Sequence, residues 1–252
     1  MNEKIGTPNL DTIPSMSIIT LAGLLLAAVA GALAAVFVLP IALPGLAASL
    51  LGPEPKAYWY LARSSAWVAY LLLWGSMMWG LLITSKAARL WPGNPAAYDV
   101  HQFISLLGIA FALFHGLILT GDRYINFSIM QVFIPFSNPA YRPLWVGIGQ
   151  IGFYTMAIVG LSFYVRRAIT PRVWRLIHYL SFGTFLFVLL HGITSGTDSA
   201  QPWAVLLYWF TGGTVMFLTA YRILLAVIMK VQVWISSGGE SAALRETPLP
   251  RA

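Results

Sequence analysis

Long runs of apolar residues, broken by short polar segments, set the pattern of this chain. A helix that crosses a bilayer needs roughly 20 mostly apolar residues. The pattern predicts six such helices, at residues 16–38, 57–85, 100–120, 144–165, 173–194 and 203–230. We therefore expect an all-α integral membrane protein, built as a six-transmembrane-helix bundle. For residues 16–38 a secretory signal is the alternative, but its apolar core would be shorter and the flank with Lys4 is weakly basic.

The segments beside these helices predict the domain organisation. Residues 1–15 form an N-terminal segment, residues 16–56 hold the first helix and an outer loop, and residues 57–230 form one helical domain. The apolar stretch at residues 125–136 is too short to span, so we expect it to lie along the interface or to cap the bundle. Residues 231–252 are expected to be a disordered tail, because Gly, Ser and Pro recur there.

The composition agrees with an exterior covered by lipid. Hydrophobic residues make up 58% of the chain and charged residues 9%, whereas soluble domains are about 45–50% apolar and about 25% charged. The net charge of +7 comes from basic residues in short segments between apolar runs. This distribution indicates membrane topology and not a nucleic-acid surface. The absence of cysteine excludes disulfides, iron–sulfur clusters, thiolate-bound or covalently attached haem, and cysteine nucleophiles.

The basic residues also orient the bundle. With six helices both termini share a side, and eleven of the fifteen Lys and Arg residues fall on that side. The strongest indicator is the loop between the fourth and fifth helices, which carries Arg166, Arg167, Arg172 and Arg175. Because cytoplasmic loops are rich in Lys and Arg, we expect both termini in the cytoplasm. The chain is then a multi-pass protein of the cell inner (plasma) membrane.

The chain has four histidines, and all of them fall in two of the predicted helices. His101 and His115 lie fourteen residues apart in the third helix, and His178 and His191 lie thirteen apart in the fifth. At a rise of 1.5 Å per residue, each pair spans roughly 20 Å. The two helices run in the same direction, so His101 is level with His178, and His115 with His191. Ionisable groups inside a bilayer are costly and usually mark function.

Two imidazoles at each of two depths are the ligands that two b-type haems with bis-histidine ligation require. One check is imperfect. At 100° per residue, a spacing of fourteen leaves side chains about 40° apart around the helix, but a spacing of thirteen leaves about 140°. The fifth helix then needs a bend or bulge, which Gly183 or Gly192 could permit, or haems approached from different sides. Gly108 lets a flat macrocycle approach, or simply packs against another helix.

Other interpretations of the histidines are weaker. A single membrane histidine often makes only an interhelical hydrogen bond, but that does not explain four of four paired by depth. The pairs are too far apart to share one bare metal ion, and no carboxylate joins them at membrane depth. Two axial imidazoles leave haem iron with no open position for a substrate, so such haems would carry electrons.

Several short motifs accompany the histidines: Arg63-Ser64-Ser65, Arg142-Pro143-Leu144-Trp145, Trp174-Arg175-Leu176-Ile177-His178, and His191-Gly192 with Gly196-Thr197-Asp198-Ser199. Over residues 58–223 the chain resembles the ferric reductase-like transmembrane domain family, the membrane part of ferric reductases and NADPH oxidases. The resemblance implies that residues 57–230 are a haem-binding domain of that kind. It implies that His101 and His178 ligate the inner haem, and His115 and His191 the outer one. Unequal histidine spacing is a trait of this family.

The chain departs from the family in one respect. Members often continue into a cytoplasmic domain that binds flavin and a nicotinamide nucleotide, but only residues 231–252 follow the last predicted helix. No FAD or NADPH site fits there. We therefore expect a separate electron donor: a cytoplasmic-side protein, a quinol, or a subunit of a larger membrane complex. The haem subunit of the periplasmic methionine-sulfoxide reductase system also lacks that domain, and this chain resembles it only in general plan.

Charged residues near the histidines are candidates for binding haem propionates, which need cationic partners. Arg63 stands alone in an apolar helix and is expected to bind a propionate of the outer haem, or to snorkel to lipid headgroups. Arg175 or Arg172, close to His178, could serve the inner haem or carry only topological charge. Trp174 is interpreted as an interfacial anchor in preference to an electron relay.

Two carboxylates follow the outer histidines. Asp122 and Asp198 each lie seven residues beyond His115 or His191, and they could attract a cation such as ferric iron. The simpler interpretation is that Asp198 caps the last helix and that Asp122 is solvated.

The sequence favours a haem b oxidoreductase subunit that moves electrons from a cytoplasmic-side donor to an outer acceptor. Ferric iron, oxygen or a periplasmic redox partner would suit single-electron transfer, and the direction rests on the family resemblance. A structural or assembly subunit of a larger membrane complex, with or without haem, is the alternative. A transporter or channel has little support, because the histidines are the main polar groups at membrane depth. Membrane lipid is an expected partner, and nucleic acid is not.

Overall fold

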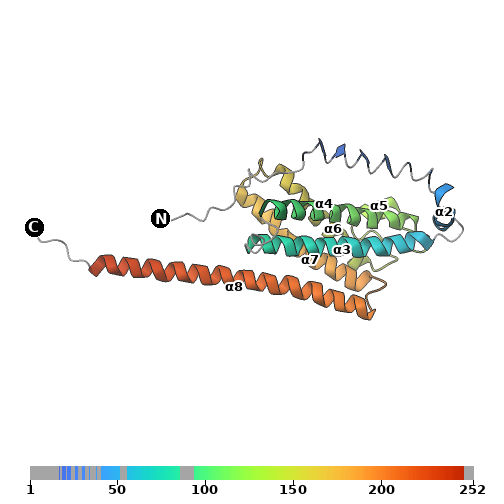
Figure 1. The fold of residues 1–252 in the computed structure, drawn as a ribbon. Coiled ribbons are helices and arrows are strands. Elements are labelled where there is room, and N and C mark those ends of the chain that lie inside the picture. Colours follow the sequence, from blue (N-terminus) through green and yellow to red (C-terminus); the bar gives the residue numbers. More distant parts are fainter. Residues whose placement is uncertain are drawn as a thin grey trace, which may run out of the picture.

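The computed structural model describes scattered positions between residues 17 and 43, then residues 44–51, 56–85 and 94–246, with side chains as far as residue 234. The secondary structure of these stretches is entirely helical (Figure 1). The helices are α2 (Pro44–Leu51), α3 (Lys56–Thr84), α4 (Asn94–Ile118), η3 (Leu119–Gly121), α5 (Ile129–Phe133), α6 (Pro143–Val165), α7 (Pro171–Ser195) and α8 (Pro202–Glu246).

Five of these helices contain segments long and apolar enough to cross a membrane, at Lys56–Thr84, Ala96–Gly121, Pro143–Val165, Pro171–Ser195 and Pro202–Trp234. Each exceeds the roughly 20 residues that the hydrocarbon core requires. They coincide with the second to sixth helices predicted from sequence, which confirms a multi-pass, all-helical membrane protein. The predicted first helix, at residues 16–38, falls mostly outside the described residues. The count of six and the cytoplasmic location of the termini therefore stay predictions.

The helices pack most closely in two pairs, α3 with α4 and α6 with α7, and α8 lies against α3. The buried core joins four of them through Tyr70, Leu73, Met77, Met156, Phe185 and Val215. The outer faces are also apolar. On α8, for example, Leu206, Met216 and Phe217 are 70%, 72% and 68% exposed. A helix that is apolar on its exposed face as well as its packed face belongs in lipid.

Two hydrogen bonds between α3 and α8 define how these helices run. Tyr70 and Thr211 bond through their hydroxyls, and Trp74 Nε1 donates to Thr214 Oγ1 at 3.0 Å. Positions on both helices therefore advance together, and the two helices are parallel. Because a buried polar group in hydrocarbon needs a partner within the protein, these bonds also fix the register of α8 on α3.

Two helix starts follow from local sequence. Pro171 is the first residue of α7, where its missing N–H is not needed, and the side chain of Thr170 accepts a hydrogen bond from Val173 N at 3.3 Å. Pro143 likewise begins α6, after Arg142 in a left-handed conformation with φ of 40°. These starts set the depth at which each helix carries its histidine or its packing glycine.

The connection before α6, residues 122–142, packs against α6. Its short helix α5 begins with a capping box between Ser128 and Gln131. The side-chain amide of Gln150 on α6 donates to the backbone oxygens of Gln131 at 2.7 Å and Val132 at 2.8 Å. These bonds hold residues 125–136 against α6, and the choice between an interfacial segment and a cap stays a prediction.

Helix α8 continues to Glu246, whereas the sequence predicts a disordered tail from residue 231. The prediction gave weight to Ser236, Ser237, Gly238 and Gly239, which disfavour helix. The residues at 242–246 are Ala, Ala, Leu, Arg and Glu, all good helix formers. In Figure 1 this end of α8 extends well past the other helices. Residues 247–252 lie outside the described part of the chain.

Candidate functional site

The structure brings the four histidines together as two pairs between α4 and α7. The ring centres of His101 and His178 are 6.2 Å apart, with an interplanar angle of 68°. Those of His115 and His191 are 6.5 Å apart, at 67°. These are the pairs that the sequence places at equal depth. We name them the inner pair (His101, His178) and the outer pair (His115, His191), after the predicted orientation.

The unequal spacing on α7 occurs without a break in the helix. Helical structure continues from Pro171 to Ser195, so no π-bulge separates His178 from His191. A spacing of thirteen residues leaves their side chains about 140° apart around the helix. Both rings nevertheless face histidines of α4. Continuous helix excludes the bulge, and the choice between a bend and haems approached from different sides stays a prediction.

Backbone carbonyls orient both outer histidines. His115 Nδ1 donates to Ala62 O on α3 at 2.8 Å, and His191 Nδ1 donates to Trp145 O on α6 at 2.9 Å. With the proton on Nδ1, each neutral ring keeps the lone pair on Nε2 for a metal. Partners of this kind fix the tautomer and ring orientation of metal-binding histidines.

Two serines give His101 a comparable partner. Ser105 Oγ donates to His101 O at 2.6 Å, so the hydrogen between Ser105 Oγ and Ser76 Oγ, 2.6 Å apart, comes from Ser76. A lone pair of Ser76 then faces His101 Nδ1 at 3.4 Å, a long and weak bond. The sequence analysis missed both serines. Their signal is a pair of hydroxyls in apolar helices, one of them a turn after His101.

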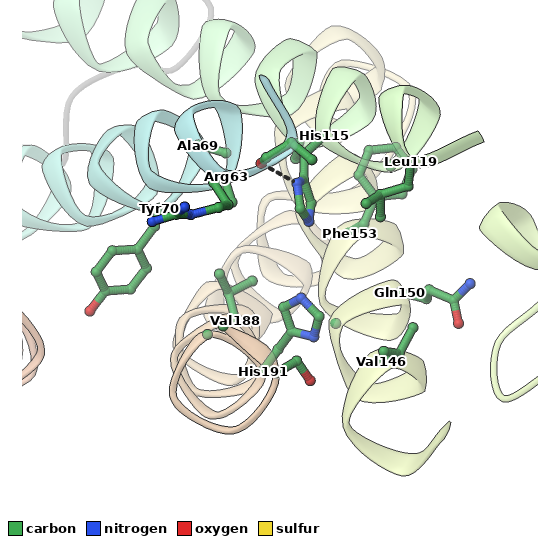
Figure 2. A pocket seen from close by; sticks show the side chains of 18 of the residues that line it. Arg63, Ala69, Tyr70, His115, Leu119, Val146, Gln150, Phe153, Val188 and His191 are labelled. Carbon is green, nitrogen blue, oxygen red and sulfur yellow. Dashed lines mark hydrogen bonds between the residues drawn. The ribbon is translucent and has the colours of Figure 1, made fainter. Parts of the chain in front are cut away.

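The outer pair opens into a cavity of about 240 Å³. Figure 2 shows the rings of His115 and His191 inside it, with the bond from His115 drawn as a dashed line. Its wall is mostly apolar and includes Trp59, Phe127, Phe153, Val188 and Tyr208. The connection before α6 supplies part of this wall. A mostly apolar cavity with two convergent imidazoles suits a flat apolar cofactor.

Arg63 also lines this cavity, but its guanidinium is paired with Asp198. Arg63 Nε donates to Asp198 Oδ2 at 2.9 Å, and a second bond joins Nη2 to Oδ1. The guanidinium also lies 4.1 Å over the ring of Trp59. Arg63 therefore does not snorkel alone to lipid, and the Asp198 side chain binds Arg63 in place of capping α8. The ion pair ties the start of α3 to the turn between α7 and α8.

We expect Asp198→Asn to destabilise the protein by about 1–2 kcal/mol, because it leaves a partly buried guanidinium without its carboxylate. The side chains of Arg63 and Asp198 are 31% and 13% exposed, which places the pair between surface and buried cases. The measurement is thermal unfolding of Arg63→Gln, Asp198→Asn and the double variant. A double variant whose cost equals the sum of the two single costs would show that the pair contributes nothing.

The two arginines near His178, Arg172 and Arg175, are both exposed. Their role at an inner haem propionate stays a prediction. Trp174 is more than an anchor, because its ring stacks on His178 with centres 5.1 Å apart and an angle of 24°. That stacking, one helical turn apart, holds the inner imidazole in place.

Asp122 is not solvated, which corrects the simpler expectation for it. The residue is only 6% exposed, and its Oδ1 accepts hydrogen bonds from Tyr124 N at 2.8 Å and Ile125 N at 3.3 Å. A short carboxylate can stabilise a turn by binding backbone N–H groups a few residues ahead. Asp122 therefore stabilises the beginning of the connection before α6, and its role differs from that of Asp198.

Glycines allow close approach around the histidines. A Cβ added at Gly80 on α3 would meet His101 Cε1 at 3.4 Å, and one at Gly149 on α6 would meet His191 Nδ1 at 2.5 Å. Gly108 has a packing role, since a Cβ there would lie 2.9 Å from Met156 Cε and 3.4 Å from Leu72 Cβ. Gly183 has open space around it.

Both pairs have the spacing that a shared haem iron requires. Two imidazoles on opposite sides of one metal, each at about 2.0 Å, have ring centres about 6 Å apart. The two observed separations, 6.2 and 6.5 Å, agree with this. Among the described residues, no cluster of three or more His, Cys, Asp or Glu could hold a metal ion alone. Two axial histidines fit haem iron, whose other four ligands come from the porphyrin.

Comparisons with protein-family models, with curated proteins and with solved structures gave no match. The resemblance to the ferric reductase-like family therefore rests on the histidine pairs and on the short motifs that accompany them.

Proposed function

We propose that this chain is a membrane haem subunit that passes single electrons across the bilayer through two bis-histidine b-type haems. One observation carries the proposal: two membrane helices hold all four histidines as facing pairs, with ring centres 6.2 and 6.5 Å apart. Within each helix the two histidines are separated by roughly 20 Å. Two sites so placed span much of the roughly 30 Å hydrocarbon core.

In this proposal His101 and His178 hold the inner haem, and His115 and His191 hold the outer one. When bound, haem supplies an iron centre that exchanges one electron at a time. The residues of the chain hold and orient this centre. Carbonyl partners set the outer imidazoles, and the serine pair and Trp174 set the inner ones. Because both axial positions would be occupied by imidazole, substrates are not expected to bind at iron.

The surroundings of the outer pair support electron transfer in preference to chemistry at iron. The wall of the cavity is mostly apolar, and the connection before α6 forms part of it. Arg63 stands at the cavity wall, beside Asp198. We propose that this guanidinium remains available to a haem propionate, since Arg has five donors and the bonds to Asp198 use two of them. Arg63 would then balance carboxylates from the protein and the cofactor together.

The donor and acceptor are proposed from the resemblance to ferric reductases. We propose a separate cytoplasmic-side protein or a quinol as donor, and ferric iron, oxygen or a periplasmic redox partner as acceptor. The proposal includes the six-helix topology, with both termini cytoplasmic, in the plasma membrane. The excess of Lys and Arg between α6 and α7 supports this orientation.

The first test is a dithionite-reduced minus oxidised spectrum of the purified protein, with haem counted per chain. We expect two b-type haems per chain, and no spectral change with carbon monoxide, because neither iron has an open position. A protein without a b-type signal would defeat the proposal.

A second measurement separates a conduit from an assembly subunit. Proteoliposomes with a trapped ferric complex are given an impermeant reductant outside, and the internal ferric complex is expected to be reduced. Liposomes with the His115→Ala variant are the matched control and should stay oxidised. Two haems per chain without transfer in either sample would favour the structural or assembly role in a larger complex.

A further inference from the structure

Arg222 lies on the packed face of α8, where the other residues are buried. Ala204, Thr211 and Val215 on this face are 0%, 0% and 6% exposed. Arg222 follows Val215 by seven residues, or nearly two turns, and therefore lies on the same face. Its Nη1 atom is buried and has no hydrogen-bond partner. Since buried polar groups in folded proteins are nearly always partnered, this atom needs an explanation.

The depth of Arg222 matches that of the inner histidine pair. Phe185 of α7 and Val215 of α8 belong to the same core cluster. The short turn at residues 196–201 makes α7 and α8 antiparallel. The register of α8 on α3 gives the depth more closely, because Trp74 Nε1 donates to Thr214 Oγ1. Eight residues on along each parallel helix, Arg222 is level with Leu82. Gly80, two residues before Leu82, faces His101, so Arg222 lies within one turn of the inner pair.

Two tryptophans near that level also have a buried donor without a hydrogen-bond partner. The indole Nε1 atoms of Trp79 and Trp174 are buried without a hydrogen-bond partner. Trp174 stacks on His178, and Trp79 directly precedes Gly80, the glycine that faces His101. Three buried donor atoms, one each on α3, α7 and α8, thus lie near one depth of the bundle. Among the side chains described there, none supplies them with an acceptor.

We infer that Arg222 binds an anionic oxygen group at the level of the inner histidine pair, with the two indoles as further donors. Guanidinium and indole groups only donate hydrogen bonds, so the missing partner is an acceptor. The positive charge of the guanidinium makes that partner an anion. The inference rests on the proposed function, in which the group is a propionate of the inner haem. A lipid phosphate would offer the same chemistry.

This assignment replaces Arg175 as the inner propionate partner. Arg175 is close to His178 in sequence, but it is exposed. Arg222 is far from His178 in sequence, and only the packing of α8 brings it to that depth. Arg222 is partly buried, so water screens its charge less than that of the exposed Arg175.

The test compares Arg222→Gln with Arg172→Gln, which removes an exposed arginine at the start of α7. The readout is the rate of haem transfer to apomyoglobin, with the inner haem identified as the one missing in His101→Ala. We expect the inner haem to leave Arg222→Gln about ten- to a hundredfold faster than the wild type, because a charge-assisted hydrogen bond is lost. Its midpoint potential should also fall, while Arg172→Gln stays unchanged. Equal behaviour of the two variants would overturn the inference.

Two further arms identify the source of the anion and do not depend on one variant folding. Wild-type protein loaded with haem dimethyl ester should lose its inner cofactor as fast as Arg222→Gln loses haem, and Arg222→Lys should retain haem better than Arg222→Gln. Phosphatidylcholine and phosphatidylglycerol both carry a phosphate, so the ester-loaded protein is the arm that separates the sources. If the wild type kept the dimethyl ester at its inner site as firmly as haem, while Arg222→Gln still lost both faster, the site would be assigned to a lipid phosphate and the propionate would be refuted. A wild-type protein without haem would refute the proposed function and this inference together, whereas two haems with equal variants would refute the inference alone.

Discussion

Replacing either outer histidine, His115 or His191, by alanine is expected to lower the haem content from two per chain to one. Replacing either inner histidine should remove the other haem. The two pairs lie roughly 20 Å apart along their helices, and their orienting partners are separate, so the loss of one pair leaves the other intact. The measurement is the pyridine haemochrome count, with a redox titration to show which of two midpoint potentials disappears.

The double variants are the matched controls for this result. The effects of substituting two histidines that bind the same haem are not additive. The double variant His115→Ala with His191→Ala should therefore still retain one haem. His101→Ala combined with His191→Ala should retain none. If instead every single variant loses both haems, or none loses any, the assignment of two independent pairs is wrong. Thermal unfolding of each variant distinguishes a lost cofactor from a lost fold.

Gly149→Ala is expected to abolish the outer haem while the inner haem remains. A Cβ at Gly149 would lie 2.5–2.9 Å from three atoms of the His191 ring. That ring is held by its bond to Trp145 O on the same helix, so it cannot move aside without losing its partner. Alanine is about 1 kcal/mol better than glycine within a helix. The expected loss of the outer haem therefore has a steric cause, and it occurs although alanine is the better helix former.

Gly183→Ala is the control for this prediction. Gly183 lies on α7 between the two histidines, and a Cβ there meets nothing within 4 Å. The same change of residue on the ligand-bearing helix should leave both haems in place and slightly stabilise the protein. Haem counts and midpoint potentials of the two variants decide the matter. A Gly149→Ala protein with an unchanged outer potential would mean that His191 is not a ligand in the orientation seen here.

Much of the fold was predictable because membrane spans depend on composition over long windows. Five of the six predicted spans are found, since apolar length alone determines a span. The largest differences are the start of α4 at Asn94 and the end of α8 at Glu246. The pairing of His101 with His178, and of His115 with His191, was also predictable. It needed only the rise per residue and the direction of each helix.

The rest depends on contacts between segments distant in sequence. Arg63 looked alone in its helix, yet its carboxylate partner, Asp198, lies 135 residues further on. From sequence Asp122 is expected to be solvated, but it is only 6% exposed. Arg222 is one of the eleven basic residues on the side of the termini, and only its place on the packed face of α8 suggests a further role. In each case tertiary packing sets the environment of a charge, and a single sequence does not show it.

The thirteen-residue spacing on α7 has a consequence for how the protein tolerates change. Both histidines of α7 meet partners on α4, and each meets its partner only at the present angle between the two side chains. Inserting one residue between positions 178 and 191 would turn one histidine by about 100° relative to the other, toward the spacing that looks more regular on a helical wheel. The spacing would then look more regular, but one of the two histidine pairs would be broken. Length between these two ligands is therefore a stricter requirement than the identity of the residues that fill it.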